Sequence, residues 1–117
     1  MTKIIDKNYA KSLIGAELDA AVAMCIGKNH HIIDGKCYLI LAEDVLFNPS
    51  ENCFIAGQFI KDNLIHVLPV SKCDPEKKWS GFISGMPKIQ FGPTPLIAAM
   101  RAYVSWKVQQ SINNIGK

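Results

Sequence analysis

Two stretches of the chain place apolar residues at the three- and four-residue spacing of a helix that buries one side. In residues 15–26 the apolar positions are Leu18, Ala21, Val22, Cys25 and Ile26. In the second stretch, which starts at Pro95, they are Ile97, Met100, Val104 and Val108. Gly27 is placed to end the first helix. Thr94 can cap the start of the second with its hydroxyl, and Pro95 suits a first helical position.

Shorter apolar runs between turn residues predict β-strands. Residues 37–41 are expected to form a buried strand, residues 64–68 and 79–83 an antiparallel pair, and residues 88–91 a further short strand. A short helix is expected from Ser50, as its N-cap, to about Asp62. Residues 1–12 are polar, and we expect them to fray or to lie along the surface.

These elements predict an α+β fold. A small, mostly antiparallel β-sheet is covered by two amphipathic helices and one short helix, in a layout like an α/β/α sandwich. The length of 117 residues predicts a single domain, 1–117. A hydrophobic fraction of 49% with 20% charged residues is typical of a globular chain rather than a disordered one.

Charge and hydropathy narrow the classes of partner. The net charge of +3 permits an anionic ligand, but it falls short of the clustered basic surface of a nucleic-acid-binding protein. No apolar run has the length of a membrane span, and the first residues lack the apolar core of a signal peptide. We therefore expect a cytoplasmic protein that binds neither membranes nor nucleic acid.

Two predicted helix starts could together hold an anion. Helices are expected to begin at Ser50 and Thr94, each after a proline-containing loop, and exposed amides at converging helix starts favour phosphate or carboxylate. Charged residues that could assist are Arg101, Lys88 and His66, and an aromatic ring that could stack on a base is Trp79 or Phe91. The alternative is that both ends are structural caps with no ligand.

Catalytic and metal-binding patterns are absent from the sequence. No nucleophile elbow, zinc-protease motif, phosphate-binding loop or dinucleotide-binding glycine motif occurs. The spacing of Cys25, His30, His31 and Cys37 matches no usual zinc site, and a solvated histidine pair in a loop is the better interpretation. The four cysteines are expected to be free thiols. We predict no catalytic residues, no metal and no cofactor.

Trp106 falls on the side of the last helix opposite its apolar positions. An outward tryptophan suggests an interface, of which a homo-oligomer is the simplest kind. The alternative is that this helix is buried on two sides, or that Trp106 is only partly exposed.

Three blocks of this chain resemble the signature blocks of the NinX-like phage proteins. They are residues 15–23 (GAELDAAVA), 47–50 (FNPS) and 92–101 (GPTPLIAAMR), in the same order and at similar separation. The resemblance covers about residues 13–108 and implies a phage α/β/α sandwich that acts inside an infected bacterium. The chain departs from the family pattern at Glu51, Asn52 and Cys53, where a threonine, an aspartate and a tryptophan are usual. It also departs at Ile14, where a Ser or Thr cap is usual.

The family's function is unknown, so the functional hypothesis adds an analogy with small phage proteins that counter host defence. In it, the chain is a homo-oligomeric sponge that sequesters a phosphate-containing nucleotide signal, of the cyclic oligonucleotide or cyclic ADP-ribose type, without turnover. The candidate ligand-binding residues are Asn48, Ser50, His66, Trp79, Lys88, Gly92, Thr94 and Arg101. The alternative is a phage protein that inhibits a host defence or replication enzyme by direct contact, and an enzyme that modifies a nucleotide is a third.

Overall fold

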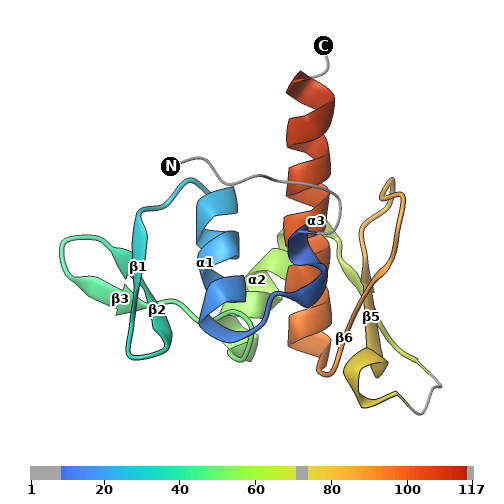
Figure 1. Cartoon of the computed structure of the whole chain (residues 1–117), viewed down its shortest axis with the longest axis horizontal. Helices are drawn as coiled ribbons and strands as arrows, with labels where there is room; N and C mark the ends of the chain where they lie inside the picture. The colour runs from blue at the N-terminus through green and yellow to red at the C-terminus, as the bar shows by residue number, and fades with distance from the viewer. Residues whose placement is uncertain (1–8, 71–73, 116–117) are drawn as a thin grey trace.

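The computed structural model describes residues 9–70 and 74–115 and confirms the α+β class. Three α-helices and two antiparallel sheets make up this part of the chain (Figure 1). The elements in order are η1 (Tyr9–Ser12), α1 (Gly15–Cys25), β1 (His30–Ile33), β2 (Lys36–Ile40), β3 (Asp44–Leu46), α2 (Cys53–Asn63), β4 (His66–Pro69), η2 (Pro75–Lys77), β5 (Trp79–Phe82), β6 (Gln90–Gly92) and α3 (Pro95–Ile115).

The strands form two three-stranded sheets instead of the one sheet expected. The first sheet has the order β1-β2-β3 and the second the order β4-β5-β6, with every neighbouring pair antiparallel. Figure 1 shows the two sheets on opposite sides of the helices. The predicted pairing of residues 64–68 with 79–83 is confirmed in register, since His66 lies opposite Phe82 and Pro69 opposite Trp79.

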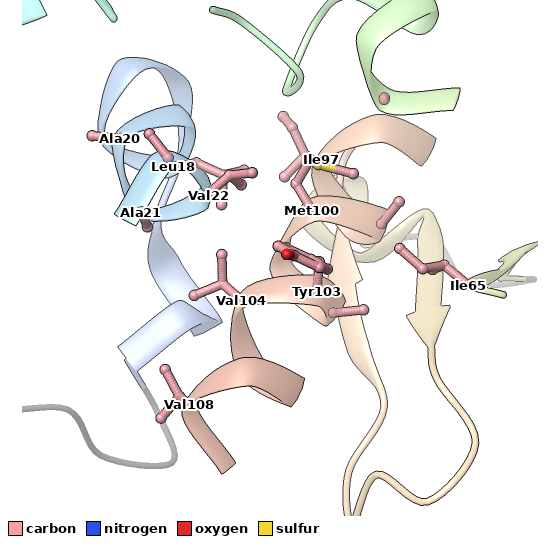
Figure 2. Close-up of a cluster of buried hydrophobic side chains, with 14 of the residues drawn as sticks. Leu18, Ala20, Ala21, Val22, Ile65, Ile97, Met100, Tyr103, Val104 and Val108 are labelled. Carbon is pink, nitrogen blue, oxygen red and sulfur yellow. The ribbon is translucent and has the colours of Figure 1, made fainter. Parts of the chain in front are cut away.

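Helix α3 is the centre of the fold. It packs against α1, α2 and the second sheet, and each residue from Ile97 to Val104 is buried. Figure 2 shows Leu18 and Val22 of α1 pointing toward Met100 and Val104 of α3. The expectation of a single apolar side on this helix is therefore wrong, because small residues bury its other side against the sheet. The interpretation that the helix is buried on two sides holds, and Trp106 is half-buried and packs on the core.

Glycines in the second sheet allow α3 to approach closely. A Cβ added at Gly81 would collide with the backbone carbonyl of Ala98, and one added at Gly92 would lie 2.8 Å from the Ala98 nitrogen. Gly92 is thus a packing residue of β6, buried beneath the helix. Gly92 was predicted to hold a ligand phosphate, but it is buried and offers no exposed surface for one.

We predict that Gly81→Ala lowers the free energy of unfolding by about 2 kcal/mol, because helix and strand backbones must separate to admit the methyl group. Urea unfolding followed by circular dichroism measures this change. Gly57→Ala is the matched control: a Cβ at Gly57, within α2, has open space around it, so the same change there should stabilise by about 0.5–1 kcal/mol. Equal effects at both positions would contradict close packing at Gly81.

The observed N-cap residue is the predicted one at α3 and a different one at α2. Thr94 Oγ1 accepts a hydrogen bond from the Ile97 amide at 3.2 Å, as an N-cap does. At α2 the cap is Asn52, whose side chain accepts from the amides of Phe54 and Ile55, so the prediction of Ser50 as the cap is wrong. Ile14 precedes α1 without a side-chain cap.

The first sheet differs most from expectation. His30 and His31 lie in β1 rather than in a loop, and His31 Nε2 lies 3.1 Å from Asp44 Oδ2. The expected buried strand at residues 37–41 is β2, of which only Cys37 is buried, because just one face of this sheet meets α1. Short exposed strands next to turn residues carry too weak an alternation to be recognised from sequence.

The predictions for residues 1–12 and for the four cysteines can be compared with the structure where it describes them. Residues 1–8 lie outside the described part of the chain, while Tyr9–Ser12 form η1, which contacts α3. Cys25, Cys37 and Cys53 are free thiols, half-buried, buried and exposed respectively, and Cys73 lies outside the described residues. No described helix is both long enough and apolar enough to cross a membrane.

Candidate basic cavity

A cavity of about 480 Å³ opens between the segment before α1, the turn η2 and the edge strand β6. Cations dominate its wall, with Lys11, Lys77, Lys88 and Arg101 against one carboxylate, Glu76. We call it the basic cavity; its remaining lining residues are Ser12, Ile14, Ile89 and Phe91. A concave site of this size with apolar walls and converging cations is suited to an anionic small molecule.

Arg101 forms the floor of the basic cavity and also ties two chain segments together. It is 7% exposed; its Nε donates to the Leu13 carbonyl at 2.9 Å and its Nη1 to the Phe91 carbonyl at 2.8 Å. Burial lowers the pKa of the guanidinium from its ordinary value, while the charge of Glu76 opposes that shift. Arginine stays protonated under such conditions. Arg101 is therefore a buried cation with two of its three nitrogens already committed.

The third nitrogen of Arg101, Nη2, makes no hydrogen bond within the described residues. In the same part of the chain, every buried polar side-chain atom has a partner. Arg101 lines the basic cavity, so its guanidinium is a candidate partner for an anion there.

Phe91 is the aromatic wall of the basic cavity. Lys77 Nζ stands 5.9 Å from the centre of the Phe91 ring. Of the two rings expected to stack on a base, Trp79 does not line this cavity, because it pairs with Gly92 and so projects from the other face of the sheet. His66 is also absent from the lining; its ring lies 5.8 Å from that of Phe82 on β5.

The starts of α2 and α3 do converge, but on a different and mainly apolar cavity of about 520 Å³, which Ser50 of the loop before α2 also lines. Its lining residues are Ile14, Gly15, Ser50, Glu51, Cys53, Thr94, Pro95, Leu96 and Ile97. Three amides of these first turns are bonded to the caps: Thr94 accepts from Ile97, and Asn52 accepts from Phe54 and Ile55. The two helix starts therefore lie close together, and their caps engage part of the amides that the sequence offers for an anion.

Ser50 instead forms hydrogen bonds with the buried carboxylate of Asp19. Its amide donates to Asp19 Oδ1 at 2.8 Å, and its hydroxyl lies 3.1 Å from Asp19 Oδ2. Asp19 is 3% exposed, and burial raises its pKa to about 6, although the bonds from Ser50 oppose the shift. Asn48 lies beside this pair; its side chain contacts Glu51 and Asn52. Ser50 thus fixes the loop before α2 to α1, while Asn48 forms its bonds within that loop.

The structure therefore places the candidate site residues in separate parts of the surface. Lys88 and Arg101 meet in the basic cavity; Ser50 and Thr94 line the apolar one, and Asn48 lies beside Asp19. Sequence reasoning missed Lys11, which it placed in a fraying end. Lys77 was likewise not among the candidate ligand-binding residues. No periodicity or motif marks either lysine, because three separate segments bring them together.

Comparison with known families places the three sequence blocks in a matching family. The family described as Bacteriophage P22, NinX matches residues 8–107 of the chain. The match spans all three blocks singled out in the sequence. No curated protein matches the chain.

Proposed function

Since the chain belongs to the bacteriophage P22 NinX family, we propose that it is a phage-encoded binding protein that sequesters a phosphate-containing nucleotide without turnover. The nucleotide is an immune signal of the cyclic oligonucleotide or cyclic ADP-ribose type, and the protein acts in the cytoplasm of the infected cell. The observation that carries the proposal is the basic cavity, which four cations and the aromatic ring of Phe91 line together.

The chemistry of the basic cavity supports a ligand with phosphate and a flat, apolar part. Arg101 Nη2 and the ammonium groups of Lys11, Lys77 and Lys88 supply donors for phosphate oxygens. Phe91 and Ile89 supply apolar contact for a base. A simple anion would use the cations alone, while a nucleotide uses both parts of the wall. The volume of about 480 Å³ lies within the range of small-molecule sites.

Sequestration without turnover agrees with what lines the basic cavity. The described lining contains one carboxylate and one serine, with no histidine or cysteine to act as base or nucleophile. Binding that uses cations and an aromatic ring requires no such group. We therefore propose a binding protein, not an enzyme.

The test is a thermal-shift screen of the full chain against cyclic dinucleotides, cyclic trinucleotides and ADP-ribose derivatives. A ligand at about 100 times its Kd should add about 2.7 kcal/mol to the stability. Chromatography of the ligand after denaturing the protein should return the compound unchanged. A different compound would show an enzyme, and no shift with any of these nucleotides would overturn the nucleotide proposal.

Lys88→Glu should weaken binding of the compound found in that screen by at least about tenfold, since each 1.4 kcal/mol of lost interaction is one decade. Lys88 is exposed, so the fold should persist. Lys61→Glu is the matched control, an exposed lysine on α2 that does not line the basic cavity. Isothermal titration calorimetry at fixed ionic strength separates the two. An equal loss in both variants would indicate nonspecific charge attraction.

A second candidate, inhibition of a host enzyme by direct contact, is favoured by Phe54. This side chain is 85% exposed at the start of α2, next to Cys53 of the apolar cavity. Large aromatic residues exposed beside a groove are typical anchors of protein interfaces. Under this proposal Phe54→Ser abolishes the capture of a host protein by tagged chain, whereas Lys88→Glu does not. The nucleotide proposal expects the reverse dependence in the ligand-binding assay.

A further inference from the structure

The sheet of β1, β2 and β3 has one face that no element of the described chain covers. Cys37 is 1% exposed and Leu39 packs on the core, so these two residues of β2 face the body of the protein. Because neighbours along a strand point to opposite faces, Tyr38 and Ile40 face away. The register places Ile33 and Leu46 on the same side, since Leu46 lies opposite Tyr38 and Ile33 opposite Lys36. We call this surface the outer face.

The outer face carries four large apolar or aromatic side chains, more than a solvated sheet face ordinarily has, beside the polar residues Lys36, His31 and Asp44. Ile33, Ile40 and Leu46 are 46%, 44% and 41% exposed, and Tyr38 between them is half-buried. Antiparallel sheets with one solvated face ordinarily alternate polar residues outward. A group of large aliphatic side chains on one exposed face is typical of an interaction surface. We propose that a second copy of this chain covers the outer face, sheet against sheet, to form a homodimer.

The charges on the outer face are arranged to match those of a second copy. Lys36 begins β2 and lies opposite Ile33, while Asp44 begins β3 and lies opposite Ile40, so the two charges stand at opposite ends of the face. A two-fold axis across the strands turns the second copy end for end. Lys36 of each copy then comes beside Asp44 of the other, which also contacts His31 of its own chain, and Tyr38 with the aliphatic residues around it meets the same residues of the second copy. Aligned packing of two sheets allows this arrangement.

The size of the outer face sets the strength of the contact. A standard interface buries about 800 Å² on each partner, and three strands of three to five residues offer less. The dimer should therefore dissociate on dilution. Trp106, the interface residue expected from the sequence, is engaged within its own chain: it packs on the core, and Lys107 Nζ lies 5.4 Å from its ring.

Sedimentation velocity of the full chain, without nucleotide, tests the dimer from low micromolar to near-millimolar concentration. The mass should rise from 12.9 kDa toward twice that value. Ile40→Lys should hold the protein at the monomer mass throughout. Leu68→Lys is the matched control, since Leu68 is 61% exposed on the other sheet, and should dimerise like the unaltered chain. A monomer at every concentration, or a dimer that Ile40→Lys does not weaken, would overturn the proposal.

Charge reversal tests the two-fold arrangement itself. Lys36→Asp and Asp44→Lys should each weaken the dimer by about tenfold or more, and the double variant should recover most of the loss because the pair is restored with its signs exchanged. Circular dichroism verifies that Asp44→Lys, which breaks the contact with His31, still folds. Losses that add in the double variant would contradict the proposed stacking. None of these residues lines the basic cavity, so the test of the dimer and the test of the proposed function are independent.

Discussion

Asp19→Asn should stabilise the protein at neutral pH by about 3 kcal/mol. Burial raises the pKa of Asp19 from 3.8 to about 6, so the folded state holds a proton more tightly than the unfolded chain. A raised acid pKa makes the free energy of unfolding highest below pH 3.8 and lower as the pH rises through 6. The difference between the two pKa values converts to about 3 kcal/mol. Asparagine removes the buried charge that causes this loss.

The contacts of Asp19 make asparagine a suitable replacement. The Ser50 amide can donate to the new amide oxygen, and the new amide nitrogen can donate to the Ser50 hydroxyl. Both hydrogen bonds persist without a buried charge, whereas Asp19→Ala would leave the Ser50 amide unpaired and should destabilise.

Urea unfolding at a series of pH values measures the effect of Asp19→Asn. The unaltered chain should lose stability between about pH 4 and pH 7 relative to the variant, whose own profile should be flatter over that range. Asp62→Asn, at an exposed position on α2, is the control and should change stability by less than about 0.5 kcal/mol. An Asp19→Asn variant less stable than the unaltered chain at pH 7 would show that the ionised carboxylate is favoured in place.

The helices could be predicted from the sequence because their signals are local. Thr94 and Pro95 mark the start of α3, and Gly27, with φ of 72°, ends α1 as expected of a residue after a helix. At Ser50 the local signal misled, because Ser, Asn and Asp are all good caps and Asn52 stands two residues later. Ser50 is bonded to the distant Asp19 instead, and a pairing across 31 positions leaves no local pattern.

The candidate site could be predicted only in part, for the same reason. Lys88 and Arg101 are predicted by their charge, one beside a short strand and the other on the last helix, and both line the basic cavity. Thr94 and Gly92 were chosen for features that in the structure serve the fold, one as a cap and the other as a site of close packing. A helix start whose amides are bonded to a cap and a helix start whose amides are open to a ligand can have the same residues in the same order. They differ in whether the donors are already used.

Arg101→Met should lower the free energy of unfolding by about 3 kcal/mol. The guanidinium is the hydrogen-bond donor that joins the Leu13 carbonyl, ahead of α1, to the Phe91 carbonyl on β6. Methionine fills similar space but donates nothing, so two charge-assisted bonds are lost, each worth about 1.5–3 kcal/mol, while relaxation and water recover a part. Lys61→Met, an exposed change on α2, is the control in the same urea experiment and should be near neutral.

This structural role changes how Arg101 can be used to test the ligand. An acidic replacement such as Arg101→Glu would place a carboxylate next to the two carbonyls, so it should unfold the protein and not only abolish binding. Loss of binding in such a variant says nothing about a ligand, whereas Lys88→Glu tests the same cavity from its exposed rim. If Arg101→Met proves as stable as the unaltered chain but no longer binds nucleotide, Arg101 is a ligand residue first, and β6 is held to the segment before α1 by other contacts.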